Sequence, residues 1–271
     1  METKPLYSIV TVVYNGAEHI EKTILSVIRQ NFSDKQFIVI DGGSTDGTLD
    51  IIQKYKDKID YFSSERDNGI FDAMNKAIEV CNGRYIAFLN AGDYYEPNVL
   101  SNLSVQLSNA DKAGVVYGNT NLIIALGQKR YSTMISPRAM IDDQILIGPM
   151  FCHQSSFVKR ELFDDFGGFE NVGITGDWLY FVKLYNRGII FKYVDITIAN
   201  YLEGGASTTA AGFKESFEYK KKFGTFRFRD NFKLLLFYIK NFQPTKVILN
   251  LILWKTKMII HKNKYTKLDD E

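Results

Sequence analysis

Cysteine, long hydrophobic runs and a glycine-rich dinucleotide motif are scarce or missing in this chain. Its two cysteines, Cys81 and Cys152, form no C-x-x-C pair and belong to no metal-ligand cluster, so neither a disulfide framework nor a zinc site is expected. No run of about 18 apolar residues is present, and residues 1–7 contain no apolar signal core. We therefore expect a reduced cytoplasmic protein that is neither secreted through a signal peptide nor membrane-spanning.

Charge is distributed unevenly along the 271 residues. The formal net charge is +2, but residues 214–271 contain 14 lysines and arginines against 6 acidic residues, a net charge of +8. The remaining residues contain 19 basic and 25 acidic side chains, a net charge of −6. An acidic body suits a site that holds divalent cations, and a basic tail suits a phosphate-rich surface. Nucleic acid ranks below a membrane surface as the partner of the tail, because no recognition motif for it is present.

The first half of the chain alternates between short β-rich runs and helical patterns, and 45% of all residues are hydrophobic. This alternation predicts an α/β fold with a Rossmann-like, mainly parallel sheet and helices on both faces. No G-x-G-x-x-G motif opens the first helix, which disfavours a domain that binds NAD or FAD. The expected strands are 7–14, 36–40, 61–64 and 85–89, and the expected helices are 18–30, 48–55 and 70–81.

The second half is less regular. We expect a helix from Pro97 to about residue 109, short strands near 115–117, 120–125 and 130–135, and a helix over 177–187 that ends at Gly188. The chain is divided into a domain over residues 1–216, with halves of about 1–110 and 111–216, and a tail over 217–271.

The tail combines apolar groups with lysines. Its apolar runs at 234–239 and 247–254 flank Pro244, which predicts two amphipathic, basic helices. Such helices lie in the interface plane of an anionic bilayer, where each lysine or arginine contributes about 1 kcal/mol. Packing of the same helices against the domain, or against a second copy in a homodimer, is the alternative.

Polar residues stand at the ends of three expected strands and at the start of one helix. Ligands of open α/β folds bind in the crevice beyond the carboxyl ends of the strands. One such turn is ordinary, whereas four in chain order predict a ligand site. They are Thr11 to Asn15, Asp41-Gly42-Gly43-Ser44, Asp67-Asn68-Gly69 and Asn90-Ala91-Gly92-Asp93.

Three further motifs follow: Cys152-His153-Gln154, Thr175-Gly176-Asp177-Trp178 and Gly204-Gly205-Ala206-Ser207. Through this ordered set the chain resembles glycosyltransferase family two, the inverting GT-A enzymes. It is most similar to the members that build bacterial O-antigen and colanic acid polysaccharides. The resemblance covers residues 6 to 215 and implies a GT-A fold with a C-terminal helical, basic extension.

The resemblance implies that the nucleotide of a UDP-sugar lies across these strand ends. A carboxylate there can accept hydrogen bonds from base N–H groups or ribose hydroxyls. Arg66 is a candidate for the diphosphate, with an ordinary surface arginine as the alternative. The residues assigned to the nucleotide are Thr11, Val12, Tyr14, Asp41, Asp67, Gly69, Asn75, Asn90, Ala91 and Gly92.

The family's DxD metal motif is weakened in this chain. Asn90 and Gly92 replace the usual aspartates, so Asp93 is the only carboxylate of the motif. Mg²⁺ keeps several waters and commonly binds through one or two carboxylates plus substrate phosphates. The resemblance therefore still implies Mg²⁺ or Mn²⁺ at Asp93, with His153 as a second candidate ligand. Capping of the helix after Pro97 is the alternative for Asp93, and a structural role is the alternative for His153.

Asp177 stands where the resembled enzymes have their catalytic base. It would accept the proton of the acceptor hydroxyl while that oxygen attacks the anomeric carbon with inversion. A simple first-turn carboxylate is the alternative. Trp178 either stacks on a sugar or fills the core. The resemblance also implies a donor loop that closes over the sugar nucleotide, with an ordinary linker as the alternative; its residues are Ser207, Thr208 and Thr209.

We predict a metal-dependent inverting glycosyltransferase that moves a hexose, preferably glucose or galactose, from a UDP-sugar. The expected acceptor is a lipid-diphosphate-linked saccharide at the inner face of the cytoplasmic membrane, by family analogy. A sugar-phosphate nucleotidyltransferase is one rival, but it needs a glycine-rich, lysine-bearing loop that Tyr14-Asn15-Gly16-Ala17 does not supply. A non-catalytic GT-A domain that binds nucleotide or glycan is the other, and retention of Asp41, Asp93 and Asp177 argues against it.

Overall fold

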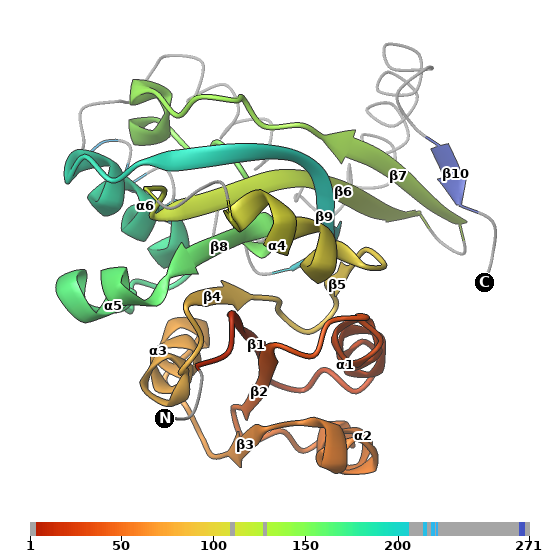
Figure 1. The fold of residues 1–271 in the computed structure, drawn as a ribbon. Coiled ribbons are helices and arrows are strands. Elements are labelled where there is room, and N and C mark those ends of the chain that lie inside the picture. The colour runs from red at the N-terminus through yellow and green to blue at the C-terminus, as the bar shows by residue number, and fades with distance from the viewer. Residues whose placement is uncertain are drawn as a thin grey trace.

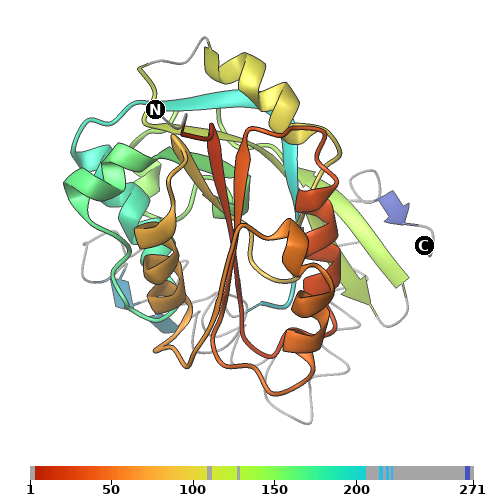
Figure 2. The same ribbon diagram turned by 60° about the horizontal axis from the view of Figure 1, so that its bottom comes forward.

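A mixed β-sheet runs through the centre of the described chain, and helices cover both of its faces (Figures 1 and 2). The structure is a computed structural model that describes residues 4–108, 112–126, 129–205, 214–215, 218–219, 221 and 266–268. The strand order is β10-β7-β6-β8-β4-β1-β2-β3, and β9 pairs with β6 and β5. The predicted α/β class is confirmed.

The first half contains the parallel part of the sheet, in which β1, β2, β3 and β4 are neighbours. Each element predicted there is present within two residues at either end. The register places Val13 opposite Asp41 and Asp41 opposite Ser64, so three strands end at one edge. The elements are β1 (Tyr7–Val13), α1 (Ile20–Ile28), β2 (Lys35–Asp41), α2 (Thr48–Lys54), η1 (Lys56–Lys58), β3 (Tyr61–Ser64), α3 (Ile70–Val80) and β4 (Tyr85–Phe88).

Successive side chains of the parallel strands enter two different cores. Val10 and Ile38 pack with α3 on one face, whereas Ile9 and Val39 pack with α1 on the other. Figure 2 shows α3 on one side of β1 and β2, and α1 with α2 on the opposite side. Burial on both faces is why these strands read as nearly continuous apolar runs. The helices thus cover both faces of the sheet, and the polar turns lie at the edge where the strands end.

The second half turns the sheet antiparallel, because β8 pairs antiparallel with β4 and β6, and β6 with β7. The sheet is therefore mixed beyond β4. The predicted strands at 115–117 and 120–125 are one strand, β6, whose pairing with β9 is irregular between Tyr117 and Thr120. The elements are β5 (Tyr94–Tyr95), α4 (Val99–Ser108), β6 (Val115–Leu126), β7 (Lys129–Ile135), η2 (Asp143–Leu146), η3 (His153–Ser155), β8 (Ser156–Lys159), α5 (Arg160–Phe166), α6 (Gly176–Asn186) and β9 (Phe191–Leu202).

The predicted helix over 177–187 is confirmed as α6, and its end follows from a glycine. Gly188 has a φ of +72° and its N–H donates to the carbonyl of Tyr185, which is a left-handed helix stop.

Cys81 and Cys152 are both free thiols. Strands β8 and β9 and helix α5 were not predicted.

Little of the tail lies within the described residues. The strand β10 (Thr266–Leu268) pairs antiparallel with β7. The two predicted amphipathic helices, at 234–239 and 247–254, lie outside the described residues, as do Ser207, Thr208 and Thr209. None of the helices that the structure describes is long and apolar enough to cross a membrane.

Candidate active site

Asp41 stabilises the turn that follows β2 through only one of its two carboxylate oxygens. Its Oδ2 accepts hydrogen bonds from the N–H groups of Gly43 (3.0 Å) and Ser44 (2.9 Å) and from the Ser64 hydroxyl (2.7 Å). Its Oδ1 is buried and has no hydrogen-bond partner among the described residues. A buried acceptor without a partner costs free energy. Asp41 therefore presents an acceptor suited to a ligand N–H or O–H.

The end of β1 supplies the second part of this edge. The hydroxyl of Thr11 is buried and, within the described chain, also has no partner. Tyr14 is 65% exposed just beyond the strand. Asn15 ties the two strand ends together, because its N–H donates to Ser44 Oγ and its Oδ1 accepts from Thr45 N–H. The structure thus brings the residues predicted at β1 next to the Asp41 turn.

Asp67 reaches the same edge from the loop before α3. A Cβ atom at Gly42 would lie 2.4 Å from Asp67 Oδ2, so the carboxylate rests against the backbone directly after Asp41. Its other oxygen accepts from Gly69 N–H at 3.0 Å. Gly69 has a φ of +110° at the start of α3, which a side chain would strain. The neighbouring Arg66 is exposed.

Asn75 lies on α3 but turns its amide toward the second half. Its Nδ2 donates to the carbonyl of Phe169 (2.9 Å) and its Oδ1 accepts from Phe169 N–H (2.8 Å). A Cβ atom at Gly168 would collide with this amide. Asn75 is therefore engaged within the protein, and its contact with a nucleotide stays a prediction.

The Asn90 to Asp93 turn crosses the end of β1. Ala91 N–H donates to the carbonyl of Val12 (3.2 Å), and Gly92 N–H donates to Thr23 Oγ1 (3.0 Å). The Nδ2 of Asn90 lies 3.2 Å from Nε2 of His153, while its Oδ1 is buried without a partner among the described residues. The weakened motif thus faces an imidazole.

Asp93, the only carboxylate of this turn, is 5% exposed. Its Oδ1 accepts from Leu202 N–H (3.0 Å) and its Oδ2 accepts from Gln154 Nε2 (2.9 Å). Burial raises the pKa of Asp93 to about 6, although these two hydrogen bonds and His153 act in the opposite direction. Both of these bonds go to distant segments and not to α4, so helix capping does not explain Asp93.

The Cys152-His153-Gln154 motif gave no role to Gln154, which the structure places beside Asp93. It is 5% exposed and its amide fixes one oxygen of Asp93. The available signal was a glutamine directly after His153 in the Cys152-His153-Gln154 motif, because one short helix then delivers two polar groups to one place.

Asp177 forms an ion pair with His153 at the start of α6. Its Oδ2 lies 2.7 Å from His153 Nδ1, and its Oδ1 accepts from Trp178 N–H at 2.7 Å. Burial alone would lower the pKa of His153, but the charges of Asp177 and Asp93 raise it above its ordinary value. The two side chains are 18% and 24% exposed, so they remain accessible to a substrate.

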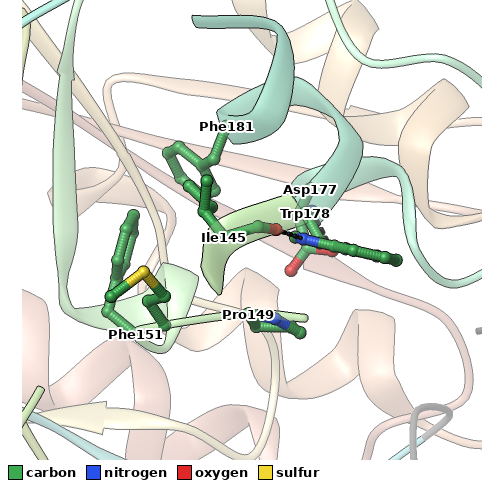
Figure 3. Close-up of a pocket in the computed structure, with 7 residues that line it drawn as sticks. Ile145, Pro149, Phe151, Asp177, Trp178 and Phe181 are labelled. Carbon is green, nitrogen blue, oxygen red and sulfur yellow. Dashed lines mark hydrogen bonds between the residues drawn. The ribbon is translucent and has the colours of Figure 1, made fainter. Parts of the chain in front are cut away.

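Asp177 also borders a small apolar pocket. Figure 3 shows Asp177 and Trp178 on one side of it, with Phe151 and Phe181 on the other. Trp178 is 2% exposed and its indole N–H donates to the carbonyl of Ile145, so it belongs to the core. Ile145, Pro149 and Met150 complete the lining.

The donors near Asp93 decide whether a divalent cation fits. The described residues contain no group of three or more His, Cys, Asp or Glu placed to hold a metal. Both ring nitrogens of His153 are engaged, with Asp177 and Asn90. What remains is the Asp93 carboxylate, each oxygen of which retains a lone pair, and the buried Oδ1 of Asn90. This set fits Mg²⁺ or Mn²⁺ completed by water and phosphate, and does not fit an all-protein cage.

The chain matches known proteins over most of its length. The model of glycosyl transferase family 2 matches residues 8–167. A PGL/p-HBAD biosynthesis glycosyltransferase of Mycobacterium bovis is 28% identical over 212 residues, which cover 76% of this chain and 80% of the relative.

Two solved structures share the fold. The complex of S. aureus TarS 1-349 with UDP-GlcNAc has a TM-score of 0.65 and 18% identity, over 92% of this chain and 70% of that one. The mannosyltransferase PcManGT of Pyrobaculum calidifontis, in complex with GDP-Man and Mn²⁺, has a TM-score of 0.61 and 16% identity, over 95% and 76%. These similarities establish the GT-A fold.

Proposed function

The chain belongs to glycosyl transferase family 2 and is a glycosyltransferase, and from this premise we propose that it transfers a hexose from a UDP-sugar to a lipid-diphosphate-linked saccharide. One observation carries the proposal. The His153 imidazole contacts both Asp177 and Asn90, so a single side chain joins the expected base to the turn expected to face the diphosphate. Family membership alone would not require that contact.

The donor would lie across the ends of β1 and β2. Asp41 Oδ1 and Thr11 Oγ1 are acceptors without partners among the described residues, which suits the N–H and O–H groups of a uridine. The S. aureus neighbour was solved with UDP-GlcNAc and the Pyrobaculum neighbour with GDP-Man. We propose UDP-glucose or UDP-galactose as the donor.

A divalent cation, Mg²⁺ or Mn²⁺, would be held by Asp93 and Asn90. When bound, it would neutralise charge on the departing diphosphate, which is worth several kcal/mol of transition-state stabilisation. Support comes from the unpartnered Asn90 oxygen within the described chain and from the Mn²⁺ in the Pyrobaculum structure.

Asp177 would act as the general base. The acceptor oxygen attacks the anomeric carbon, the bond from that carbon to the phosphate oxygen breaks, and UDP departs while the hydroxyl proton passes to the Asp177 carboxylate. One displacement inverts the anomeric configuration. His153 holds the Asp177 oxygen at 2.7 Å, which keeps the carboxylate in one orientation for the incoming hydroxyl.

A product assay tests the whole proposal. The protein is incubated with UDP- and GDP-sugars and diphosphate-lipid acceptors, with and without Mn²⁺, and the products are identified by mass spectrometry. We expect a UDP-hexose to lengthen the lipid-linked saccharide only when the cation is present. Formation of a nucleotide sugar from UTP and a sugar phosphate would favour a nucleotidyltransferase. Nucleotide binding without any product would favour a non-catalytic domain.

We also propose that the tail over 217–271 holds the enzyme at the inner face of the cytoplasmic membrane. Its net positive charge supports this. Charge reversal of Lys255, Lys257 and Lys262 should reduce salt-sensitive sedimentation with anionic vesicles.

The matched control for the tail is charge reversal of three exposed lysines on the body, Lys54, Lys56 and Lys58. Vesicle binding that ignores both salt and the tail charges would contradict the membrane proposal. It would instead favour packing of the tail against the domain or against a second copy of the chain.

A further inference from the structure

Glu215 contacts the start of the helix that carries Asp177, although it lies 40 residues further along the chain. Its Oε1 accepts hydrogen bonds from Ile174 N–H (2.9 Å), Thr175 N–H (2.9 Å) and the Thr175 hydroxyl (2.7 Å). Its Oε2 also lies 2.9 Å from Ile174 N. One carboxylate thus takes up three donors of the turn that leads into α6.

The N-cap residue of helix α6 makes no capping bond within the described chain, so Asp177 is the residue of its first turn that accepts from a helix N–H, that of Trp178. Thr175 occupies the N-cap position but makes no capping bond to the described residues of the helix, since its hydroxyl is turned to Glu215. A helix N-terminus favours a negative charge and needs acceptors for its free N–H groups. Glu215 provides the negative charge from outside the helix and accepts from the N–H groups of the N-cap residue Thr175 and of Ile174 before it.

The turn is shaped to admit this carboxylate. Gly173 has a φ of +86°, and a Cβ atom there would lie 2.2 Å from Glu215 Oε2. On the other side of the turn, a Cβ atom at Gly176 would lie 2.7 Å from the carbonyl of Glu170. Tyr219, four residues beyond Glu215, packs against the core that contains α6. Glu215 and Tyr219 therefore both contact the body of the protein.

We propose that Glu215 is a positioning residue that fixes the first turn of α6 and thereby holds Asp177 against His153. Asp177 is the second residue of the helix, so a displacement of Ile174 and Thr175 moves its carboxylate relative to the imidazole. The role assigned to Asp177 rests on the proposed function, whereas the capping contact does not. A shift of about 1 Å in a reacting group can cost a hundredfold in rate.

Hydrogen exchange tests the contact without any substrate. In Glu215→Ala, the amides of residues 171–180 should exchange about fivefold faster than in the wild type, as expected for a lost helix cap. Glu218→Ala is the matched control, because Glu218 is an exposed glutamate of the same segment, and its exchange over 171–180 should equal that of the wild type. Wild-type exchange in Glu215→Ala would overturn the proposal.

Steady-state kinetics test the consequence for Asp177. Glu215→Ala should lower kcat about tenfold or more while leaving KM for the sugar nucleotide unchanged. Glu215→Gln should recover most of kcat, because one amide oxygen can still accept from Ile174 and Thr175. Faster exchange combined with wild-type kcat would show a purely structural cap and would overturn the positioning role.

Two further outcomes remain decisive. If Glu215→Ala does not fold, Glu215→Asp replaces it with the same expectations, since the shorter side chain keeps the charge but cannot reach both Ile174 and Thr175. If the wild type transfers sugar from no donor, the proposed function fails together with the positioning of a base. The capping contact is then still confirmed or refuted by the exchange measurement alone.

Discussion

The described chain places polar side chains by two different means, contacts within one half and contacts between its two halves. We call residues 4–108 the nucleotide half and residues 112–205 the acceptor half, after the roles proposed for them. In the nucleotide half, the partners of the Asp41 side chain lie no more than 23 residues away, in the turn after β2 and at the end of the neighbouring strand β3. Asp93, at the end of that half, is held by Gln154 and Leu202, which lie 61 and 109 residues away. Local turns are sufficient for the first kind of site, whereas the second exists only after the antiparallel strands have assembled.

The largest effect is expected at Asp177, because its Asn variant removes the proton acceptor together with the charge that pairs with His153. Asp177→Asn should lower turnover by about 10²- to 10⁴-fold, the usual contribution of a general base, while calorimetry with UDP shows unchanged affinity. The nucleotide half would then bind its ligand independently of the acceptor half.

Asp165→Asn is the matched control, because Asp165 is an exposed aspartate on α5. Near-normal turnover in Asp177→Asn would contradict the assignment of the base. The exposed Glu170 and Glu203 would then be the next carboxylates to test.

Asp93 should show how much stability the protein loses by burying a carboxylate among segments that are distant in the sequence. Burial raises its pKa from 3.8 to about 6. Between these values the unfolded chain has lost the proton that the folded chain keeps, so the free energy of unfolding falls as the pH rises from about 4 to about 6. The Asp93→Asn variant lacks this pH dependence. Relative to the wild type, its free energy of unfolding should therefore rise by on the order of 2–3 kcal/mol across that interval.

Urea unfolding at pH 4.5 and 7.5, in EDTA, measures this difference. Asp50→Asn is the control, because Asp50 is exposed on α2. A difference between Asp93→Asn and wild type that is the same at both pH values would show that Asp93 ionises normally in the folded state.

Asp41 should behave as a ligand acceptor in a turn that survives its substitution. In Asp41→Asn the amide oxygen can keep the bonds to Gly43, Ser44 and Ser64, while the amide nitrogen replaces the unpartnered Oδ1. UDP affinity should fall about ten- to a hundredfold, since a hydrogen bond to a charged group is lost. Calorimetry compares it with Asp57→Asn, an exposed aspartate of η1, and equal affinities would remove the nucleotide assignment.

The nucleotide half could be predicted from the sequence because its signals are local. Alternating apolar runs and helical patterns predicted the four parallel strands and three helices over residues 7–88, and parallel strands that share an edge bring Asp41 and Asp67 together wherever the register holds. Glycines added information where the backbone is crowded, as at Gly42, which leaves room for Asp67.

The acceptor half could not be predicted to the same depth. Strand β6 was read as two strands because Gly118 and Asn119 interrupt its pattern. In the structure a Cβ atom at Gly118 would lie 2.6 Å from the carbonyl of Ile196, so the glycine marks a close approach of β9 and not a strand end. Strand β9 was not predicted, although the alternation of Val194, Ile196 and Ile198 is a signal for it. No local pattern reveals that Leu202 binds Asp93 or that Glu215 binds the turn before α6.

Asn75 on α3 links the two halves through hydrogen bonds to Phe169, and we expect its substitution to have the smallest effect on stability and binding. Its amide donates to and accepts from the backbone of Phe169, 94 residues away. Asn75→Ala leaves both Phe169 groups without that partner and should cost about 1–2 kcal/mol in the free energy of unfolding, measured by urea denaturation. Asn82→Ala, at an exposed position just after α3, is the control. If Asn75 only links the two halves, the UDP affinity of Asn75→Ala should equal that of the wild type. A loss of affinity at unchanged stability would instead assign Asn75 to nucleotide binding.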